Sequence, residues 1–145
     1  MIQLERMKIM DSKKLIEELK RDEGVKLFPY KCSANKLTIG VGRNIEERGI
    51  TEDEANYLLK NDLTMCVEEV ESIFTWYPYL TDSRKRVIVN MVFNLGLSRF
   101  LNFKKFIDAM EQKDYETAGK EMLDSKWAKQ VGDRAKRLKQ MIVEG

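Results

Sequence analysis

The sequence TDSRKRVIVNMVFNLG, which ends at Gly96, constrains the fold of this chain more than any other segment. Thr81 or Asp82 can cap a helix at its start, and from Val87 to Leu95 that helix is apolar all round. Because such a helix is stable only when other helices surround it, we expect it at the centre of a bundle. Amphipathic segments are predicted to supply the surrounding helices over residues 102–112, 115–124 and 133–143.

The first part of the chain predicts a helix followed by a β-hairpin. DSKKLIEELKRDEG has Asp11 or Ser12 as the N-cap, Gly24 as the stop and Glu23 in the last turn. VKLFPYK and KLTIGVG are rich in strand-forming residues, and the turn-like CSAN separates them. This pattern is typical of a small lobe that contains a sheet.

A long amphipathic helix is predicted to connect the two parts. Thr51 and Glu54 form a capping box at its start, and Cys66 lies on its apolar stripe, where a small core residue is expected. We therefore expect an α+β chain: an N-terminal lobe over residues 1–50, a connecting helix over 51–75, and a helical lobe over 76–145.

Several kinds of chemistry are excluded by composition. The chain has no histidine, which removes Ser-His-Asp and Cys-His catalysis and His-containing zinc sites. Two cysteines cannot build a disulfide framework or a four-thiolate zinc site, and we expect two reduced thiols. The 26 basic and 24 acidic residues nearly cancel, so net charge indicates no partner.

Glu23 and the hairpin after it could carry hydrolytic chemistry. The carbonyl end of a helix opposes ionisation of a carboxyl group, and an acid that keeps its proton can donate it to a glycosidic oxygen as the bond breaks. TIGVG adds the hydroxyl of Thr38 and two glycines that let sugar rings approach the backbone. Taken singly, these features are also those of a solvated carboxylate and a tight turn.

In combination, these residues resemble the active-site motif of phage-type lysozymes, glycoside hydrolase family 24. That motif is Glu, eight residues, Asp or Cys, five residues, Thr, and this chain has Glu23, Cys32 and Thr38 at that spacing. VIVNMVFNLG is similar to the buried central helix of the lysozymes of the T-even phages, and SKWAKQVGDRAKRL resembles their region around a tryptophan and an Asn-Arg-Ala-Lys-Arg run. The resemblance covers about residues 15–137.

The resemblance implies a lysozyme-like α+β fold, one domain over residues 1–145, and hydrolysis of the β-1,4 bond between N-acetylmuramic acid and N-acetylglucosamine in bacterial peptidoglycan. Glu23 matches the general acid, Thr38 matches a threonine that helps to hold the attacking water, and Cys32 falls where the T-even enzyme has an aspartate. Arg134 matches an arginine that reaches back to the catalytic glutamate. The substrate-binding positions implied are Gly42, Phe93, Leu95, Gly96 and Arg134. No cofactor or metal is implied.

Two departures from the T-even pattern bear on the N-terminal lobe. Arg43 stands where those enzymes have a histidine, so any ion pair made there must be different. The loop after the hairpin is much shorter, which predicts a lobe of two or three strands.

Cys32 leaves the mechanism open. It could be a working member of the motif, a weak substitute in an enzyme driven by Glu23, or the mark of a dead wall-binding relative. We expect its thiol to ionise readily only if Lys31 or Arg134 lies close. A lytic transglycosylase, which needs one acid, is the nearest rival, and the basic sequence KWAKQVGDRAKRLKQ could instead bind nucleic acid.

The expected partners follow from the resemblance and from the lack of targeting signals. The sequence MIQLERMKIMDSKKLI lacks a sustained apolar core, and no run approaches the roughly 18 apolar residues of a membrane span. We expect a monomer that binds peptidoglycan, does not bind nucleic acid or insert into a membrane, and stays in the host cytoplasm until a holin releases it to the cell wall.

Overall fold

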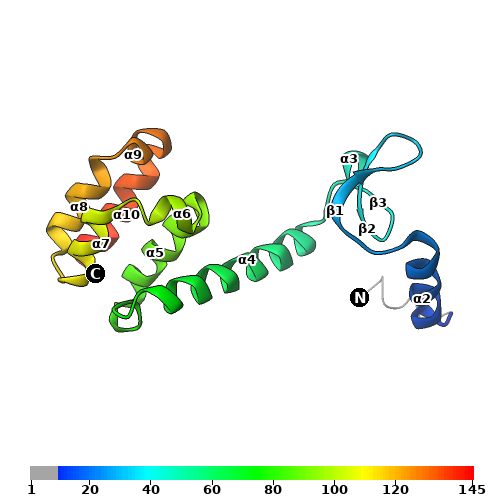
Figure 1. The fold of residues 1–145 in the computed structure, drawn as a ribbon, viewed down its shortest axis with the longest axis horizontal. Coiled ribbons are helices and arrows are strands. Elements are labelled where there is room, and N and C mark those ends of the chain that lie inside the picture. The colour runs from blue at the N-terminus through cyan, green and yellow to red at the C-terminus, as the bar shows by residue number, and fades with distance from the viewer. Residues whose placement is uncertain (1–9) are drawn as a thin grey trace. The chain divides into compact units, whose positions relative to one another are not determined.

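The computed structural model describes residues 10–145, and the chain divides into two compact units, Met1–Ala55 and Asn56–Gly145 (Figure 1). The boundary falls inside the long helix α4 (Glu52–Ile73). The beginning of the lobe predicted over residues 1–50 lies outside the described residues.

The first unit opens with helix α2 (Ser12–Glu23), as predicted. The Asp11 side chain accepts from the Lys14 amide at 3.1 Å, and the Gly24 amide closes the helix on the Lys20 carbonyl. Glu23 is therefore the last helical residue, and its position is fixed by a cap at each end of the helix.

A three-stranded antiparallel sheet follows α2. Its strands β1 (Lys26–Lys31), β2 (Leu37–Gly40) and β3 (Arg43–Asn44) pair in chain order. Thr38, in the central strand, lies opposite Tyr30 on one side and Asn44 on the other. The predicted hairpin is confirmed, and the sheet has the larger of the two strand numbers expected.

A short helical turn joins the sheet to the long helix. The turn of helix α3 (Ile45–Arg48) is capped by the Asn44 side chain, which accepts from the Glu47 amide. The predicted capping box then starts α4: the Glu54 amide donates to the Thr51 hydroxyl at 3.1 Å, and the Thr51 amide donates to the Glu54 carboxylate at 2.8 Å.

Arg43, noted above as a departure from the T-even pattern, forms an ion pair with Glu54. Its guanidinium donates two parallel hydrogen bonds to the Glu54 carboxylate, at 2.8 and 2.6 Å, and a third to the Gly49 carbonyl at 3.1 Å. The guanidinium is also the main cause that lowers the pKa of Glu54 to about 2. The sheet is thereby tied to the first turn of α4.

The second unit is helical and contains the hydrophobic core. The end of α4 leads to a short 3₁₀ helix, η1 (Tyr77–Tyr79), and to the central helix. The helices that follow are α5 (Asp82–Leu95), α6 (Leu97–Phe100), α7 (Lys104–Glu111), α8 (Tyr115–Leu123), α9 (Lys126–Val131) and α10 (Asp133–Glu144). The fully buried large side chains come from α4 to α10 and include Ile88, Met91, Phe100, Phe106, Met110, Met122 and Ile142.

Helix α5 is not apolar all round, contrary to the prediction. Val87, Ile88, Met91 and Val92 are buried, but Phe93 is 43% exposed, and Asn90 and Asn94 are not buried. The spacing of residues 90, 93 and 94 places them on one face of the helix. The central helix thus has one open face.

The other predicted helices are present with small shifts. The helix expected over residues 102–112 is α7, which begins two residues later, at Lys104. Helices α6 and α9 and the turn α3 were not predicted, because each is too short for a periodic pattern. No helix within residues 10–145 has the length and apolarity needed to cross a bilayer.

Candidate active site

Glu23 and Gly42 lie against each other in the first unit. A Cβ atom added to Gly42 would lie 2.9 Å from Oε2 of Glu23 and 3.1 Å from its Cδ. Gly42 and Gly40 flank Val41 in the tight turn between β2 and β3, with φ of 66° and 71°. Two independent reasons favour glycine at position 42: its backbone is in the left-handed region, and the Glu23 carboxylate occupies the space that a side chain would need.

Cys32 begins the tight turn between β1 and β2. Its amide donates to the Lys36 carbonyl at 3.0 Å, and its carbonyl accepts from the Asn35 amide at 2.8 Å. Asn35 has φ of 60°, a conformation that asparagine adopts more readily than most residues. The turn thus folds back on the Cys32 backbone, which is held at both its amide and its carbonyl.

Backbone amides of the turn make the thiol easier to ionise than an ordinary cysteine. The Lys36 amide lowers the pKa of Cys32 most, followed by the Thr38 hydroxyl and the Ala34 amide. Neither Lys31 nor Arg134, the charges on which the expectation rested, is among the causes, because the backbone of the turn and the Thr38 hydroxyl supply the effect. A thiolate here would carry the negative charge that an aspartate carries in the T-even motif.

Thr38 is the one buried side chain in the described part of the first unit, with 3% of its surface exposed. Its hydroxyl donates to the Lys36 carbonyl at 2.8 Å and is also one of the groups that lower the pKa of Cys32. One hydroxyl hydrogen can serve only one acceptor at a time. In the neutral thiol form that hydrogen is committed to the Lys36 carbonyl.

The second cysteine has a different environment. Cys66 is half-buried on α4 and packs against the core, as predicted, and both cysteines are free thiols. Burial raises the pKa of Cys66, with smaller effects from Glu69 and Asp62. Of the two thiols, Cys32 is therefore the easier to ionise.

Arg134 is held in the second unit by the open face of α5. Its Nε and Nη2 atoms donate to Oδ1 of Asn90 at 3.0 and 2.7 Å. Both residues line a hollow of about 650 Å³ between α4, α5 and α10. The guanidinium retains donors for a further partner, because this pairing occupies only two of its five N–H groups.

The end of α5 holds the remaining substrate-binding candidates. Phe93 is exposed, and Gly96 ends the helix with φ of 78°. Leu95 is only 7% exposed and belongs to the core, so its side chain has little surface to offer a ligand.

Asn90 and Asn94 were not predicted as functional residues. Asn94 accepts from Nε1 of Trp127 at 2.8 Å, as Asn90 does from Arg134. Two amides four positions apart in an otherwise apolar helix were the available signal, since they mark a helix face that is not packed into the core.

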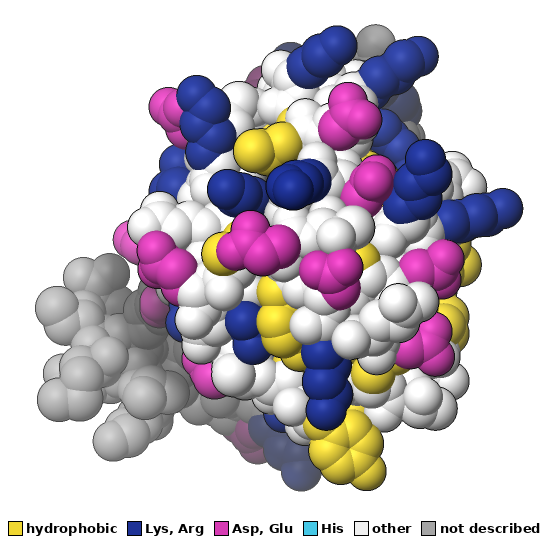
Figure 2. Space-filling view, turned by 90° about the vertical axis from the view of Figure 1, so that its left-hand side faces the viewer, with side chains coloured by type: hydrophobic (Ala, Val, Ile, Leu, Met, Phe, Trp, Pro, Cys, Tyr) yellow, Lys and Arg dark blue, Asp and Glu magenta, His cyan; other side chains and the backbone are white. Residues whose placement is uncertain are grey.

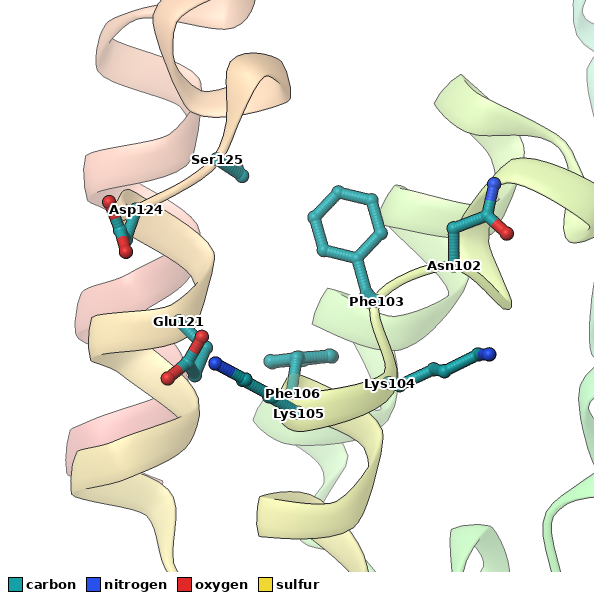
Figure 3. Close-up of a pocket in the computed structure, with 8 residues that line it drawn as sticks. All are labelled: Asn102, Phe103, Lys104, Lys105, Phe106, Glu121, Asp124 and Ser125. Carbon is teal, nitrogen blue, oxygen red and sulfur yellow. The ribbon is translucent and has the colours of Figure 1, made fainter.

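A separate hollow of about 370 Å³ lies between the start of α7 and the end of α8 (Figure 3). Phe103 and Phe106 lie between charged side chains of both signs, and Lys105 and Glu121 point toward each other. It contains none of the predicted site residues.

One face of the helical unit and the acidic residues of the described part of the chain were compared with the requirements of two other kinds of site, a basic binding surface and a metal centre. On the face of the helical unit drawn in Figure 2, Lys and Arg are interspersed with Asp and Glu, so this face has no continuous basic patch. Among residues 10–145, no group of three or more His, Cys, Asp or Glu side chains is placed to hold a metal ion.

Comparison with known proteins identifies the family of the chain. The phage lysozyme family matches residues 20–141. The chain is 33% identical to a probable T4-type lysozyme of Dictyostelium discoideum, over 88% of this chain and 92% of that protein. It is 30% identical to an endolysin of Acyrthosiphon pisum secondary endosymbiont phage 1, over 81% of this chain and 80% of that protein. It is also 27% identical to the pre-baseplate central spike protein Gp5 of Enterobacteria phage T4, over 90% of this chain and 28% of that protein. With its α+β fold and a match that runs through both units, the chain belongs to the phage lysozyme family and is a muramidase of the glycoside hydrolase class.

Proposed function

We propose that this enzyme hydrolyses the β-1,4 bond between N-acetylmuramic acid and N-acetylglucosamine in bacterial peptidoglycan, with Glu23 as the general acid. The observation that carries the proposal is the position of the Glu23 carboxylate against Gly42, in the space that a Cβ atom at that glycine would need. A proton from Glu23 to the glycosidic oxygen would let that oxygen leave as an alcohol.

Cys32 and Thr38 are proposed to act on the sugar that loses its leaving group and on the water that attacks it. The lowered pKa of Cys32 favours a thiolate, which could stabilise positive charge on the sugar or orient the attacking water. The Thr38 hydroxyl, buried beside it, could hold either that water or the thiolate. These features support Cys32 as a working member of the motif rather than a sign of lost activity.

Substrate contacts are proposed in both units. Gly42 would offer backbone to a sugar ring, Phe93 an apolar surface and Arg134 the donors that Asn90 leaves free. For Leu95 and Gly96 we propose contact through the backbone, because the Leu95 side chain is buried. The family match over residues 20–141 includes parts of both units, which supports a single catalytic domain.

The first test is Glu23→Gln, which keeps the size of the side chain and removes its acid. We expect clearing of purified cell walls to fall by at least about 100-fold, the range for loss of a general acid. Glu18→Gln is the matched control, since Glu18 is an exposed glutamate on the same helix. Equal clearing by Glu23→Gln and the parent would show that the acid is another residue.

The second test addresses Cys32. Cys32→Asp is expected to keep activity and Cys32→Ala to lose most of it. A thiol-alkylating reagent should inhibit the parent, with the adduct located at Cys32 by mass spectrometry, and should not inhibit Cys32→Asp. A fully active Cys32→Ala variant, or inhibition that follows Cys66, would remove Cys32 from the mechanism.

We also propose that the enzyme waits in the host cytoplasm and reaches the wall through a holin. The similarity to a phage endolysin supports this. Expressed alone in bacteria, the chain should cause lysis only after the inner membrane is permeabilised. Prompt lysis without permeabilisation would contradict the proposal.

A further inference from the structure

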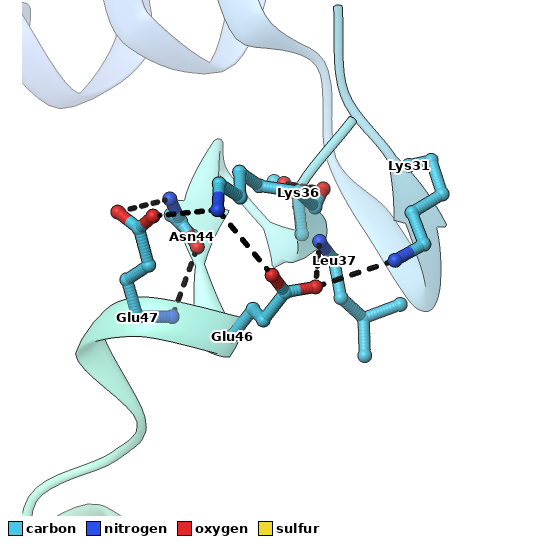
Figure 4. A network of polar contacts seen from close by, with 7 residues as sticks. Lys31, Lys36, Leu37, Asn44, Glu46 and Glu47 are labelled. Carbon is cyan, nitrogen blue, oxygen red and sulfur yellow. Dashed lines mark hydrogen bonds and ion pairs between the residues drawn. The ribbon is translucent and has the colours of Figure 1, made fainter. Parts of the chain in front are cut away.

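Glu46, on the short helix α3, has three contacts that converge on the hairpin turn (Figure 4). Its carboxylate accepts from the Leu37 amide at 3.3 Å and from the Lys31 ammonium at 3.3 Å, and it lies 3.6 Å from the ammonium of Lys36. The Leu37 amide and the two lysines keep this carboxylate ionised, since they lower the pKa of Glu46. One side chain thus binds groups from β1, from the turn and from β2.

The partners of Glu46 lie on both sides of Cys32 in the chain. Lys31 precedes Cys32 directly, and the Lys36 backbone closes the turn by accepting from the Cys32 amide at 3.0 Å. The Lys36 amide is also the group that acts most strongly on the Cys32 sulfur. The Leu37 amide that Glu46 binds and the Lys36 carbonyl that accepts from the Cys32 amide belong to one peptide unit. Rotation of that unit would therefore open the hydrogen bond that closes the turn and shift the adjoining Lys36 amide.

We propose that Glu46 is a positioning residue that holds the Cys32 turn in the conformation in which its backbone amides face the sulfur. The inference deepens the proposed function, since it assigns a support to the group that we place opposite Glu23. Glu46 itself would touch neither the substrate nor the sulfur.

Loss of Glu46 has two opposing effects on the thiol. It would loosen the turn, which removes hydrogen bonds from the thiolate, and it would release two ammonium groups, which favour the thiolate. The first effect should prevail, because hydrogen bonds act at contact distance, whereas the lysines are 40% exposed or more and their field is weakened by water and salt. The charged groups of this network are Lys31, Lys36, Glu46 and Glu47, while Arg43 on β3 is paired with Glu54.

The test measures how the rate of Cys32 alkylation depends on pH, with the adduct quantified at Cys32 by peptide mass spectrometry in the full chain. The rate at high pH reports access to the thiol, and the midpoint reports its ionisation. In Glu46→Ala we expect the midpoint to rise by about 0.5 pH unit or more, which at neutral pH is about a threefold slower reaction. Wall hydrolysis should fall as well.

Glu47→Ala is the matched control. It removes the same charge from the neighbouring position and also frees Lys36, which Glu47 binds at 2.9 Å, but Glu47 does not contact the Leu37 amide. Its midpoint should remain at the parent value. Glu46→Gln, which keeps an oxygen for the Leu37 amide, should remain closer to the parent than Glu46→Ala.

Three outcomes would overturn the proposal: a midpoint that falls in Glu46→Ala, equal shifts in Glu46→Ala and Glu47→Ala, or a Glu46→Gln variant that shifts as far as Glu46→Ala. Thermal unfolding shows whether each variant is folded. If Glu46→Ala does not fold, the alkylation midpoint of Glu46→Gln is compared with those of the parent and Glu47→Ala. The alkylation result stands even if Cys32→Ala is fully active, in which case the role of Cys32 fails but the support of its turn by Glu46 is still measured.

Discussion

Gly42→Ala should separate the placement of Glu23 from the stability of the fold. The added methyl group would lie 2.9 Å from Oε2 of Glu23, roughly half an ångström inside an ordinary carbon–oxygen contact. The carboxylate is the flexible partner, so it must move away by about that distance. Misplacement of a reacting group by about 1 Å can cost on the order of 100-fold in rate, so we expect a loss of about 10- to 100-fold.

Gly40→Ala is the control for backbone strain. Gly40 has φ of 71°, close to the 66° of Gly42, but a Cβ atom there would meet nothing within 4 Å. Both variants should lose about 1–2 kcal/mol of stability from the left-handed backbone, seen as a fall of a few degrees in Tm. Only Gly42→Ala should lose activity.

The kinetic constants show how the activity is lost. Displacement of the acid lowers kcat, whereas a methyl group that only obstructs the sugar raises KM and leaves kcat unchanged. Initial rates on soluble peptidoglycan fragments over a range of concentrations give both values. The reasoning is refuted if Gly42→Ala matches Gly40→Ala in kcat.

Two further predictions concern stability. Arg84 donates to the Ile142 carbonyl at 2.8 Å and stacks on Tyr115, 3.4 Å from the ring centre, so Arg84→Ala should cost about 1–3 kcal/mol in urea unfolding. Arg86→Ala, two positions along α5, removes only an exposed pair with Asp82 and should change stability by less than about 0.5 kcal/mol. Arg43 lowers the pKa of Glu54 to about 2, whereas an ordinary glutamate has a pKa of about 4.3. The pair therefore stabilises the folded state fully at pH values above about 4.3, and this stabilisation is lost as the pH falls to about 2. Glu54→Gln should therefore have a lower Tm than the parent at neutral pH. Between about pH 4.5 and pH 2 the Tm of the variant should fall less steeply than that of the parent, and equally steep falls would contradict the pairing.

Local signals predicted those elements whose ends are fixed by neighbouring residues. Asp11 and Gly24 bound α2, and the Thr51–Glu54 box starts α4, because capping residues act within one turn of the helix end. The Glu23–Cys32–Thr38 spacing likewise led to the family, which the comparisons confirm. The short helix α9 was missed because its six residues are too few for a periodic pattern.

The properties of the site depend on contacts that the sequence does not contain. The ease with which Cys32 ionises depends on where the Lys36 amide points, which is set by the turn rather than by charged neighbours. The sequence shows that Arg43 stands where the T-even pattern has a histidine, but it does not show which residue Arg43 binds. Its partner, Glu54, was assigned only to the capping box of α4, and it serves both contacts. The spacing of Asn90 and Asn94 marks one helix face, but their partners Arg134 and Trp127 lie 44 and 33 positions away and depend on how the helices pack.

The central claim is that Glu23 protonates the leaving oxygen in a hydrolysis, and product analysis tests it most directly. Purified peptidoglycan is digested with the parent and with Glu23→Gln, and the soluble fragments are identified by mass spectrometry. The parent should release fragments with reducing N-acetylmuramic acid ends, and Glu23→Gln should release almost none. Fragments with 1,6-anhydro ends would show a lytic transglycosylase, and full release by Glu23→Gln would place the acid at another residue.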